Sequence, residues 1–216
     1  MKVALVGAAP SWRQAPFDDP HWDIWAMNDV YVKGLPRATA WFELHPFSRL
    51  VFLPADWPED RAIIQAPNTF PRPHDHFARL VALGCRVFVQ PQDVEEAQRA
   101  GIVNARPFPF DAAGAVFPVP YEASSAAWML LYAMAWADML PRTQDRLEIG
   151  IFGIDMTHGD YQYERPNFEC LLGFAIGRGV KITLPKGCAL MSSSHRYALE
   201  PDPIAIPMDL MAAHVV

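Results

Sequence analysis

Small and hydrogen-bonding residues recur directly after the predicted strands of this 216-residue sequence and before one predicted helix. In an open α/β sheet, ligands bind where the strands end, so these positions converge on one edge and suit a nucleotide. Gly7 would let a ligand approach the backbone closely, and Ser11 would donate to a phosphate or ribose oxygen. The alternative is that Gly-x-x-Pro-Ser is only a turn. The strand-end and helix-start residues are Gly7, Pro10, Ser11, Asn28, Asp29, Glu43, His45, Ser124, Ser125, Gly153 and Asp155.

Residues 157–166 form the most polar and aromatic segment between a predicted strand and a predicted helix. Tyrosine and arginine side chains there would bind a leaving phosphate, and an imidazole or carboxylate would transfer a proton. The alternative is an ordinary ordered loop whose tyrosines cover the sheet edge. The candidates are Tyr161, Tyr163 and Arg165 for the phosphate, and His158 and Glu164 for the proton.

Motifs of several other enzyme classes do not occur. The sequence has no Walker lysine motif, no complete G-x-G-x-x-G and no D-x-D pair beside a strand. Ser124 and Ser125 lack the G-x-S-x-G context of a nucleophile, so we interpret them as a helix start whose amides face an anion. We interpret residues 74–76 (His-Asp-His) as an exposed segment that caps a helix, and we expect no metal site.

Apolar runs and their terminators predict strands that alternate with helices. Alternation along a strand places Glu43 and His45 on one face. Residues 104–121, with four prolines and a glycine, are predicted to be a loop. Strands are expected over residues 2–6, 23–27, 38–44, 85–89, 147–154 and 180–184, and helices over 75–83, from Ser124 or Ser125 to about 140, and over 167–177 after Pro166 in the first turn. The pattern predicts an α/β fold: a single Rossmann-like domain over residues 1–216, with a mostly parallel twisted sheet and helices on both faces.

Composition limits the class of protein. An apolar share of 51% with only 19% charged residues excludes a disordered chain or a coiled coil. The formal charge of −6 argues against a surface that binds nucleic acid throughout. The longest apolar stretch, residues 126–137, is shorter than the ~20 residues that span a bilayer, and no signal peptide is visible. Three separated cysteines without C-x-x-C favour a reduced, cytoplasmic protein.

Several weak motifs occur in an order that resembles one family. They are an opening strand and Gly-Pro-Ser-type turn, a second strand ending in Asn, a Ser-Ser helix start, a Gly-Ile-Asp strand end, a Tyr-x-Tyr pair and a final strand. In chain order they occupy residues 3–11, 23–28, 124–125, 151–156, 161–163 and 180–190. Together they resemble the bacterial lipooligosaccharide sialyltransferases and their relatives of unknown function.

The resemblance implies a metal-independent glycosyltransferase that uses a nucleotide-sugar donor and no further cofactor. It implies that residues 7–11, Asn28 and Ser125 touch the nucleotide. It also places His45 near a nucleotide-contacting position and Tyr161 where a tyrosine holds the donor phosphate as the nucleotide leaves.

The sequence departs from the family pattern at two points. Ala9 replaces the second glycine of the opening turn, and the lid segment that carries the family's catalytic histidine is nearly deleted. The general base is therefore reassigned to His158, Glu164 or His45. A short lid leaves room for a bulky acceptor, such as a modified DNA base or a carrier, and a homo-oligomer is compatible with the sequence. Residues 161–179 are also similar to uncharacterised phage proteins.

Two other functions stay open at this point. Related families with the same Gly-Pro-Ser turn suggest a pyrophosphoryl transferase acting on a pterin-like alcohol, which would need magnesium and release AMP from ATP. The other alternative is a non-enzymatic nucleotide-binding protein, which would bind tightly without turnover.

Overall fold

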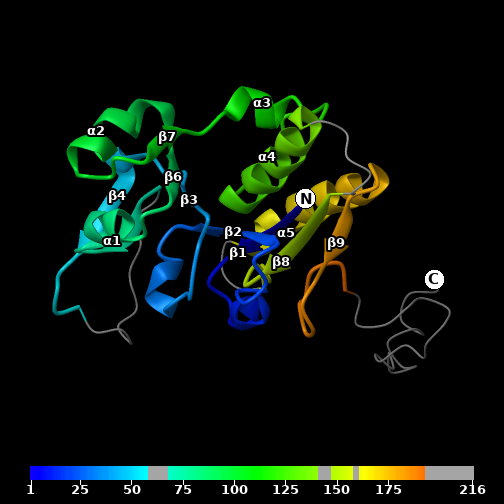
Figure 1. Cartoon of the computed structure of the whole chain (residues 1–216), viewed down its shortest axis with the longest axis horizontal. Helices are drawn as coiled ribbons and strands as arrows, with labels where there is room; N and C mark the ends of the chain where they lie inside the picture. The colour runs from blue at the N-terminus through cyan, green and yellow to red at the C-terminus, as the bar shows by residue number, and fades with distance from the viewer. Residues whose placement is uncertain (58–67, 141–146, 158–160, 193–216) are drawn as a thin grey trace, which may run out of the picture.

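Short apolar segments form a seven-stranded sheet in the computed structural model, which describes residues 1–57, 68–140, 147–157 and 161–192. Neighbouring strands all run parallel, in the order β7-β6-β3-β2-β1-β8-β9 (Figure 1). The strands are β1 (Lys2–Val6), β2 (Trp22–Met27), β3 (Ala40–Glu43), β6 (Arg86–Val89), β7 (Ala105–Pro107), β8 (Glu148–Phe152) and β9 (Lys181–Thr183). The predicted α/β, Rossmann-like fold with a parallel sheet is confirmed.

The chain changes direction across the sheet between β1 and β8. From β1 it moves outward through β2, β3, β6 and β7, and it then returns to the other side of β1 to add β8 and β9. The connections that follow β1 and β8 therefore leave in opposite directions and open a crevice at the carboxyl ends of these two strands. This crevice is where an open α/β sheet binds its ligand.

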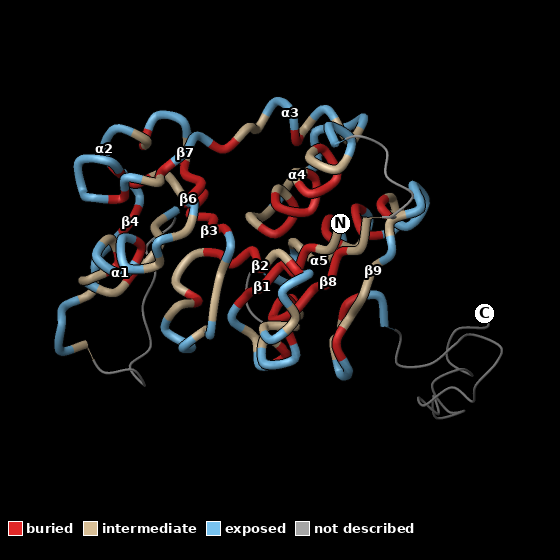
Figure 2. The backbone as a smooth tube through the Cα atoms, viewed as in Figure 1, coloured by how far each residue is buried: buried red, intermediate tan, exposed pale blue. Residues whose placement is uncertain are grey.

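Helices cover both faces of the sheet, because alternate side chains of each buried strand point to opposite faces. Leu5 belongs to a core that it shares with α4 and α5, whereas its neighbour Ala4 belongs to a second core with residues of α1 and α2. The buried backbone concentrates in the central strands and in α4 (Figure 2). The helices are α1 (His76–Ala82), α2 (Val94–Arg99), α3 (Phe110–Gly114), α4 (Ser125–Met139) and α5 (Tyr161–Gly177), and the 3₁₀ helices are η1 (Pro10–Gln14), η2 (Val30–Lys33), η3 (Phe47–Arg49) and η4 (Pro91–Asp93).

A separate pair of parallel strands, β4 (Leu50–Leu53) and β5 (Phe70–Pro73), was not expected from the sequence. β5 contains two prolines, which lack the N–H group that a central strand needs, and such residues are confined to sheet edges. The pair matters for the site because β5 carries Arg72, whose side chain is buried against the end of β3.

Two secondary-structure predictions were wrong. Residues 104–121 are not all loop, since they contain β7 and α3. β7 lies at the edge of the sheet, where Pro107 removes no ladder hydrogen bond that the fold requires. In addition, α5 begins at Tyr161, so Pro166 lies inside the helix and not in its first turn.

Candidate functional site

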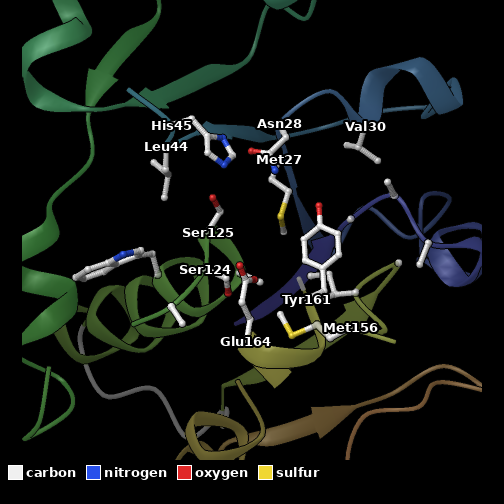
Figure 3. Close-up of a pocket in the computed structure, with 18 of the residues that line it drawn as sticks. Met27, Asn28, Val30, Leu44, His45, Ser124, Ser125, Met156, Tyr161 and Glu164 are labelled. Carbon is white, nitrogen blue, oxygen red and sulfur yellow. The ribbon is translucent and has the colours of Figure 1, made fainter. Parts of the chain in front are cut away.

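A cavity of about 660 Å³ opens at the carboxyl ends of β1, β2, β3 and β8. The predicted strand ends, the start of α4 and the first turn of α5 all contribute to its wall (Figure 3). The predicted site residues that line it are Gly7, Pro10, Asn28, Asp29, His45, Ser124, Ser125, Gly153, Asp155, Tyr161 and Glu164. Segments separated by more than one hundred residues in the sequence therefore meet at one edge of the sheet.

The floor of the cavity is a close contact between two glycines. A Cβ atom at Gly7 would lie 2.4 Å from the carbonyl oxygen of Gly153, and one at Gly153 would lie 2.3 Å from the carbonyl oxygen of Gly7. The amide of Ala9 also donates to the Gly153 carbonyl at 2.9 Å. The chain's own backbone therefore requires glycine at position 7. Gly7 also lines the cavity, so the close approach of a ligand to its backbone stays a prediction.

Ser11 has a structural role instead of the predicted ligand contact. Its hydroxyl donates to Asp155 Oδ1 at 2.9 Å and accepts the Gly153 amide at 2.9 Å, and its side chain is buried outside the cavity wall. The single hydroxyl proton is thus committed to Asp155 and cannot also be donated to a phosphate or ribose oxygen. The contact holds Asp155, which does line the cavity, beside the glycine turn.

Asn28 combines a strained backbone with a buried side-chain oxygen that has no partner. Its φ of 55° lies in the left-handed region, and the conformation is fixed by two bonds: its amide donates to the Phe42 carbonyl, and its carbonyl accepts Trp41 Nε1, both at 2.9 Å. Among the described residues nothing donates to Asn28 Oδ1, although that atom is buried. Strain and an unsatisfied polar atom at a cavity wall are typical of a ligand-binding residue.

The start of α4 faces the cavity from the opposite side. Of the two predicted start residues, Ser124 and Ser125, Ser124 is the N-cap of α4. Its hydroxyl accepts a hydrogen bond from the Ala127 amide at 3.2 Å. Ser125 and Ala126 line the cavity in the first turn of this helix. Their amides belong to the helix end that carries partial positive charge and attracts anions.

His45 and Glu43 form a hydrogen-bonded pair at the end of β3. His45 Nδ1 lies 2.7 Å from Glu43 Oε1. The His45 side chain is 20% exposed and reaches the cavity, whereas that of Glu43 is 0% exposed. In Figure 3 the His45 ring points into the cavity toward Ser125. Glu43, predicted to contact the ligand, therefore lies behind the wall and orients the residue that does line it.

Glu43 is the centre of a buried polar cluster. Arg72 binds both of its carboxylate oxygens, with Nε 2.8 Å from Oε2 and Nη2 2.9 Å from Oε1. His76 Nε2 lies 3.3 Å from Oε2, and the Tyr31 hydroxyl lies 2.6 Å from His76 Nδ1. Burial alone would raise the pKa of Glu43, but the hydrogen bond from His45, the close approach of the His76 ring and the charge of Arg72 hold it well below its usual range. Glu43 is therefore a carboxylate at neutral pH.

Several predicted residues lie elsewhere. Tyr163 is 77% exposed and Arg165 binds Glu169 at 2.9 Å and the Ala189 carbonyl, and neither lines the cavity. His158 lies outside the described residues. His76, expected in an exposed capping segment, is fully buried against Glu43.

Sequence reasoning missed the apolar part of the wall and the cluster behind it. Residues that resemble ordinary core positions line the cavity on the His45 side, and His45 itself packs on Phe70 with ring centroids 3.8 Å apart. The Pro-Arg-Pro-His run at residues 71–74 was the one available signal, since an arginine between prolines is unusual in a strand. The additional lining residues include Met27, Val30, Leu44, Pro46, Phe70, Gln90, Phe110, Glu122, Trp128 and Met156.

The side chains of Asp and Glu in the described part of the cavity wall give it only negative charge. Asp29, Glu122, Asp155 and Glu164 line it, and no lysine or arginine does within the part of the chain that the structure describes. Over the same residues, no group of three or more His, Cys, Asp or Glu is placed to hold a metal ion.

A scan against protein-family models and searches of curated proteins and of solved structures find no match to this chain. Within the described ranges, no helix has the length and apolar character needed to cross a membrane.

Proposed function

We propose that this protein is a metal-independent glycosyltransferase that moves a sugar from a nucleotide-sugar donor to an acceptor hydroxyl. The observation that carries the proposal is the His45–Glu43 pair, whose imidazole opens into a cavity at the switch point of a Rossmann-like sheet. A histidine held by a buried carboxylate is a suitable general base, because the carboxylate fixes the ring and stabilises the imidazolium that forms. Of the three base candidates, His45 is the one this arrangement favours.

The donor is proposed to lie between the glycine turn and the start of α4. Asn28 would contact the nucleotide through its unpartnered oxygen, and the Ser125 amide would bind the phosphate. In the transfer step, His45 Nε2 takes the acceptor hydroxyl proton as that oxygen bonds to the anomeric carbon. The bond from the anomeric carbon to the phosphate oxygen breaks, and its electron pair leaves with the nucleotide.

The charge of the wall favours a donor with one phosphate group. Four carboxylates surround the cavity, and each further phosphate would add like-charge repulsion that no described cationic side chain in the wall offsets. Tyr161 points into the cavity from α5 and supplies a neutral hydroxyl for the leaving group (Figure 3). The resemblance of the strand-end motifs to the sialyltransferases supports the same class of reaction.

Release of nucleotide from sugar donors tests this proposal. The purified protein is incubated in EDTA with monophosphate- and diphosphate-linked nucleotide sugars and a panel of acceptors, including hydroxymethylated nucleosides and DNA, and nucleotides are quantified by mass spectrometry. We expect release from a monophosphate-linked donor, at least tenfold faster than from the diphosphate-linked ones. A parallel incubation contains ATP and magnesium without EDTA, and magnesium-dependent release of AMP there would support pyrophosphoryl transfer in place of sugar transfer. Tight binding of a nucleotide without release in either incubation would indicate a non-enzymatic binding protein.

Replacing Asn28 by glycine should separate binding from stability. Glycine adopts the positive φ without strain but loses more chain entropy on folding, so the free energy of unfolding should stay within about 1 kcal/mol of wild type. Nucleotide affinity should fall about five- to tenfold, because one hydrogen bond worth ~1 kcal/mol is lost. Urea denaturation and calorimetric titration measure the two quantities.

Asn68→Gly is the matched control, since Asn68 also has a positive φ of 58° but is exposed and lies outside the cavity wall. It should leave affinity unchanged. Equal nucleotide affinity of wild type and Asn28→Gly would show that the Asn28 side chain does not bind the nucleotide.

A further inference from the structure

His45 Nδ1 has two partners of opposite hydrogen-bonding character. Glu43 Oε1, which can only accept, lies 2.7 Å away, and Arg72 Nη2, which can only donate, lies 2.8 Å away. A neutral imidazole carries one proton, so Nδ1 can satisfy either partner but not both at once. With the proton on Nδ1, the ring donates to Glu43; with the proton on Nε2, Nδ1 accepts from Arg72.

We propose that Arg72 is a positioning residue that allows His45 to carry its proton on either ring nitrogen. The inference rests on the proposed role of His45 at the cavity. In the Nδ1–H form, Nε2 presents a lone pair to the cavity and accepts a proton from a hydroxyl. In the Nε2–H form, the uncharged ring donates a hydrogen bond into the cavity, where a phosphate oxygen of the donor would receive it.

The rest of the cluster keeps these two partners in place. The Tyr31 hydroxyl lies 2.6 Å from His76 Nδ1, and His76 Nε2 lies 3.3 Å from Glu43 Oε2. Arg72 is anchored by Nη1, which donates to the Pro71 carbonyl at 2.9 Å, and by its two bonds to Glu43. In the Nε2–H form of His45, both Nη2 protons have acceptors, one on Glu43 and the other on His45 Nδ1. Arg72 and Glu43 are both buried, so water does not compete for these bonds.

Charges around the pair come from several elements. Glu43 and Arg72 form an ion pair that carries no net charge. The other ionisable groups near this cluster or facing His45 across the cavity are Asp29, Tyr31, Asp75, His76, Arg79, Asp93, Glu122, Asp155, Tyr161 and Glu164.

The ¹⁵N spectrum of the His45 ring tests the proposal directly. Full-length protein with ¹⁵N-labelled histidine is recorded at pH 8 without substrate, and His45 is assigned from the spectrum of His45→Gln. We expect wild-type Nδ1 to show a shift between the protonated and unprotonated values, because both tautomers are populated. In Arg72→Met, the donor is gone, so Nδ1 should be fully protonated and donate to Glu43; Arg72→Lys should restore part of the wild-type shift.

Arg99→Met is the matched control, because it removes the same charge from an exposed arginine of helix α2 and should leave the Nδ1 shift unchanged. If Arg72→Met does not fold, the wild-type spectrum still decides: a single fully protonated Nδ1 overturns the proposal. The same Nδ1 shift in wild type and folded Arg72→Met overturns it as well. Because no substrate is present, these outcomes are independent of whether the protein transfers sugar.

Discussion

Replacing Glu43 by alanine should lower the free energy of unfolding by about 3–5 kcal/mol, because it leaves the buried Arg72 guanidinium without a counter-ion. Glu43 is fully buried and binds Arg72 through both carboxylate oxygens. In the variant, water does not reach the Arg72 guanidinium, and no other described carboxylate lies within hydrogen-bond distance of it. Urea denaturation of wild type and Glu43→Ala measures the difference. Asp138→Ala is the control: it breaks an exposed pair with Arg178 and should cost about 1 kcal/mol or less. If Glu43→Ala lowers the free energy of unfolding by no more than Asp138→Ala does, the result would contradict the stabilising role assigned to the buried Glu43–Arg72 pair.

The Glu43 contribution should also depend on pH in a defined direction. The pKa of Glu43 in the folded protein lies well below its usual range, although burial opposes this, because His45, His76 and Arg72 stabilise the carboxylate. A carboxyl group with a lowered folded pKa contributes its full stability above its unfolded pKa of about 4.3, and that stability is lost as the pH falls through the folded value. The difference between wild type and Glu43→Ala should therefore be constant above about pH 5.5 and shrink in acid.

His45→Gln should reduce the rate of sugar transfer by a factor of about 10²–10⁴, which is the usual contribution of a general base. Donor affinity should change less than about threefold, because the base acts on the acceptor hydroxyl and makes its main contribution in the transition state. Single-turnover nucleotide release gives the rate, and calorimetric titration gives the affinity.

Two further variants make this prediction specific. His21→Gln replaces an exposed histidine that lies outside the cavity wall and should leave the rate unchanged. Glu164→Gln tests the rival base in α5 and should slow transfer less than His45→Gln does. A transfer rate for His45→Gln within threefold of the wild-type rate would show that another group is the general base.

Much of this site could be predicted because its main residues follow strands whose own sequences are distinctive. The β1, β2 and β8 runs are apolar and end at glycine or asparagine, and parallel strands bring their carboxyl ends to one edge. Gly7, Asn28 and Gly153 are close together for that reason. The parts of the site that depend only on strand order were therefore accessible to sequence reasoning.

The residues that were misplaced depend on structure beyond a local pattern. The polar and aromatic composition of residues 161–166 predicts a loop, but they form the start of α5. There Tyr161 and Glu164 share one face of the helix, and the intervening Tyr163 is turned outward into solvent. Arg72 reaches Glu43 across 29 positions of the sequence from β5, whose Phe-Pro-Arg-Pro sequence has no strong strand propensity. No periodicity in the segment itself could have indicated that contact.

Calorimetric titration of nucleotide sugars against wild type and Ala8→Trp tests most directly whether the cavity is the donor site. Ala8 is exposed and lines the cavity, so a tryptophan there should obstruct the space beside the glycine turn without disturbing the core. We expect one equivalent of a monophosphate-linked nucleotide sugar to bind wild type in EDTA, and Ala8→Trp to bind at least tenfold more weakly. Binding of equal strength by both proteins, or no binding of any nucleotide sugar by wild type, would contradict the proposed site.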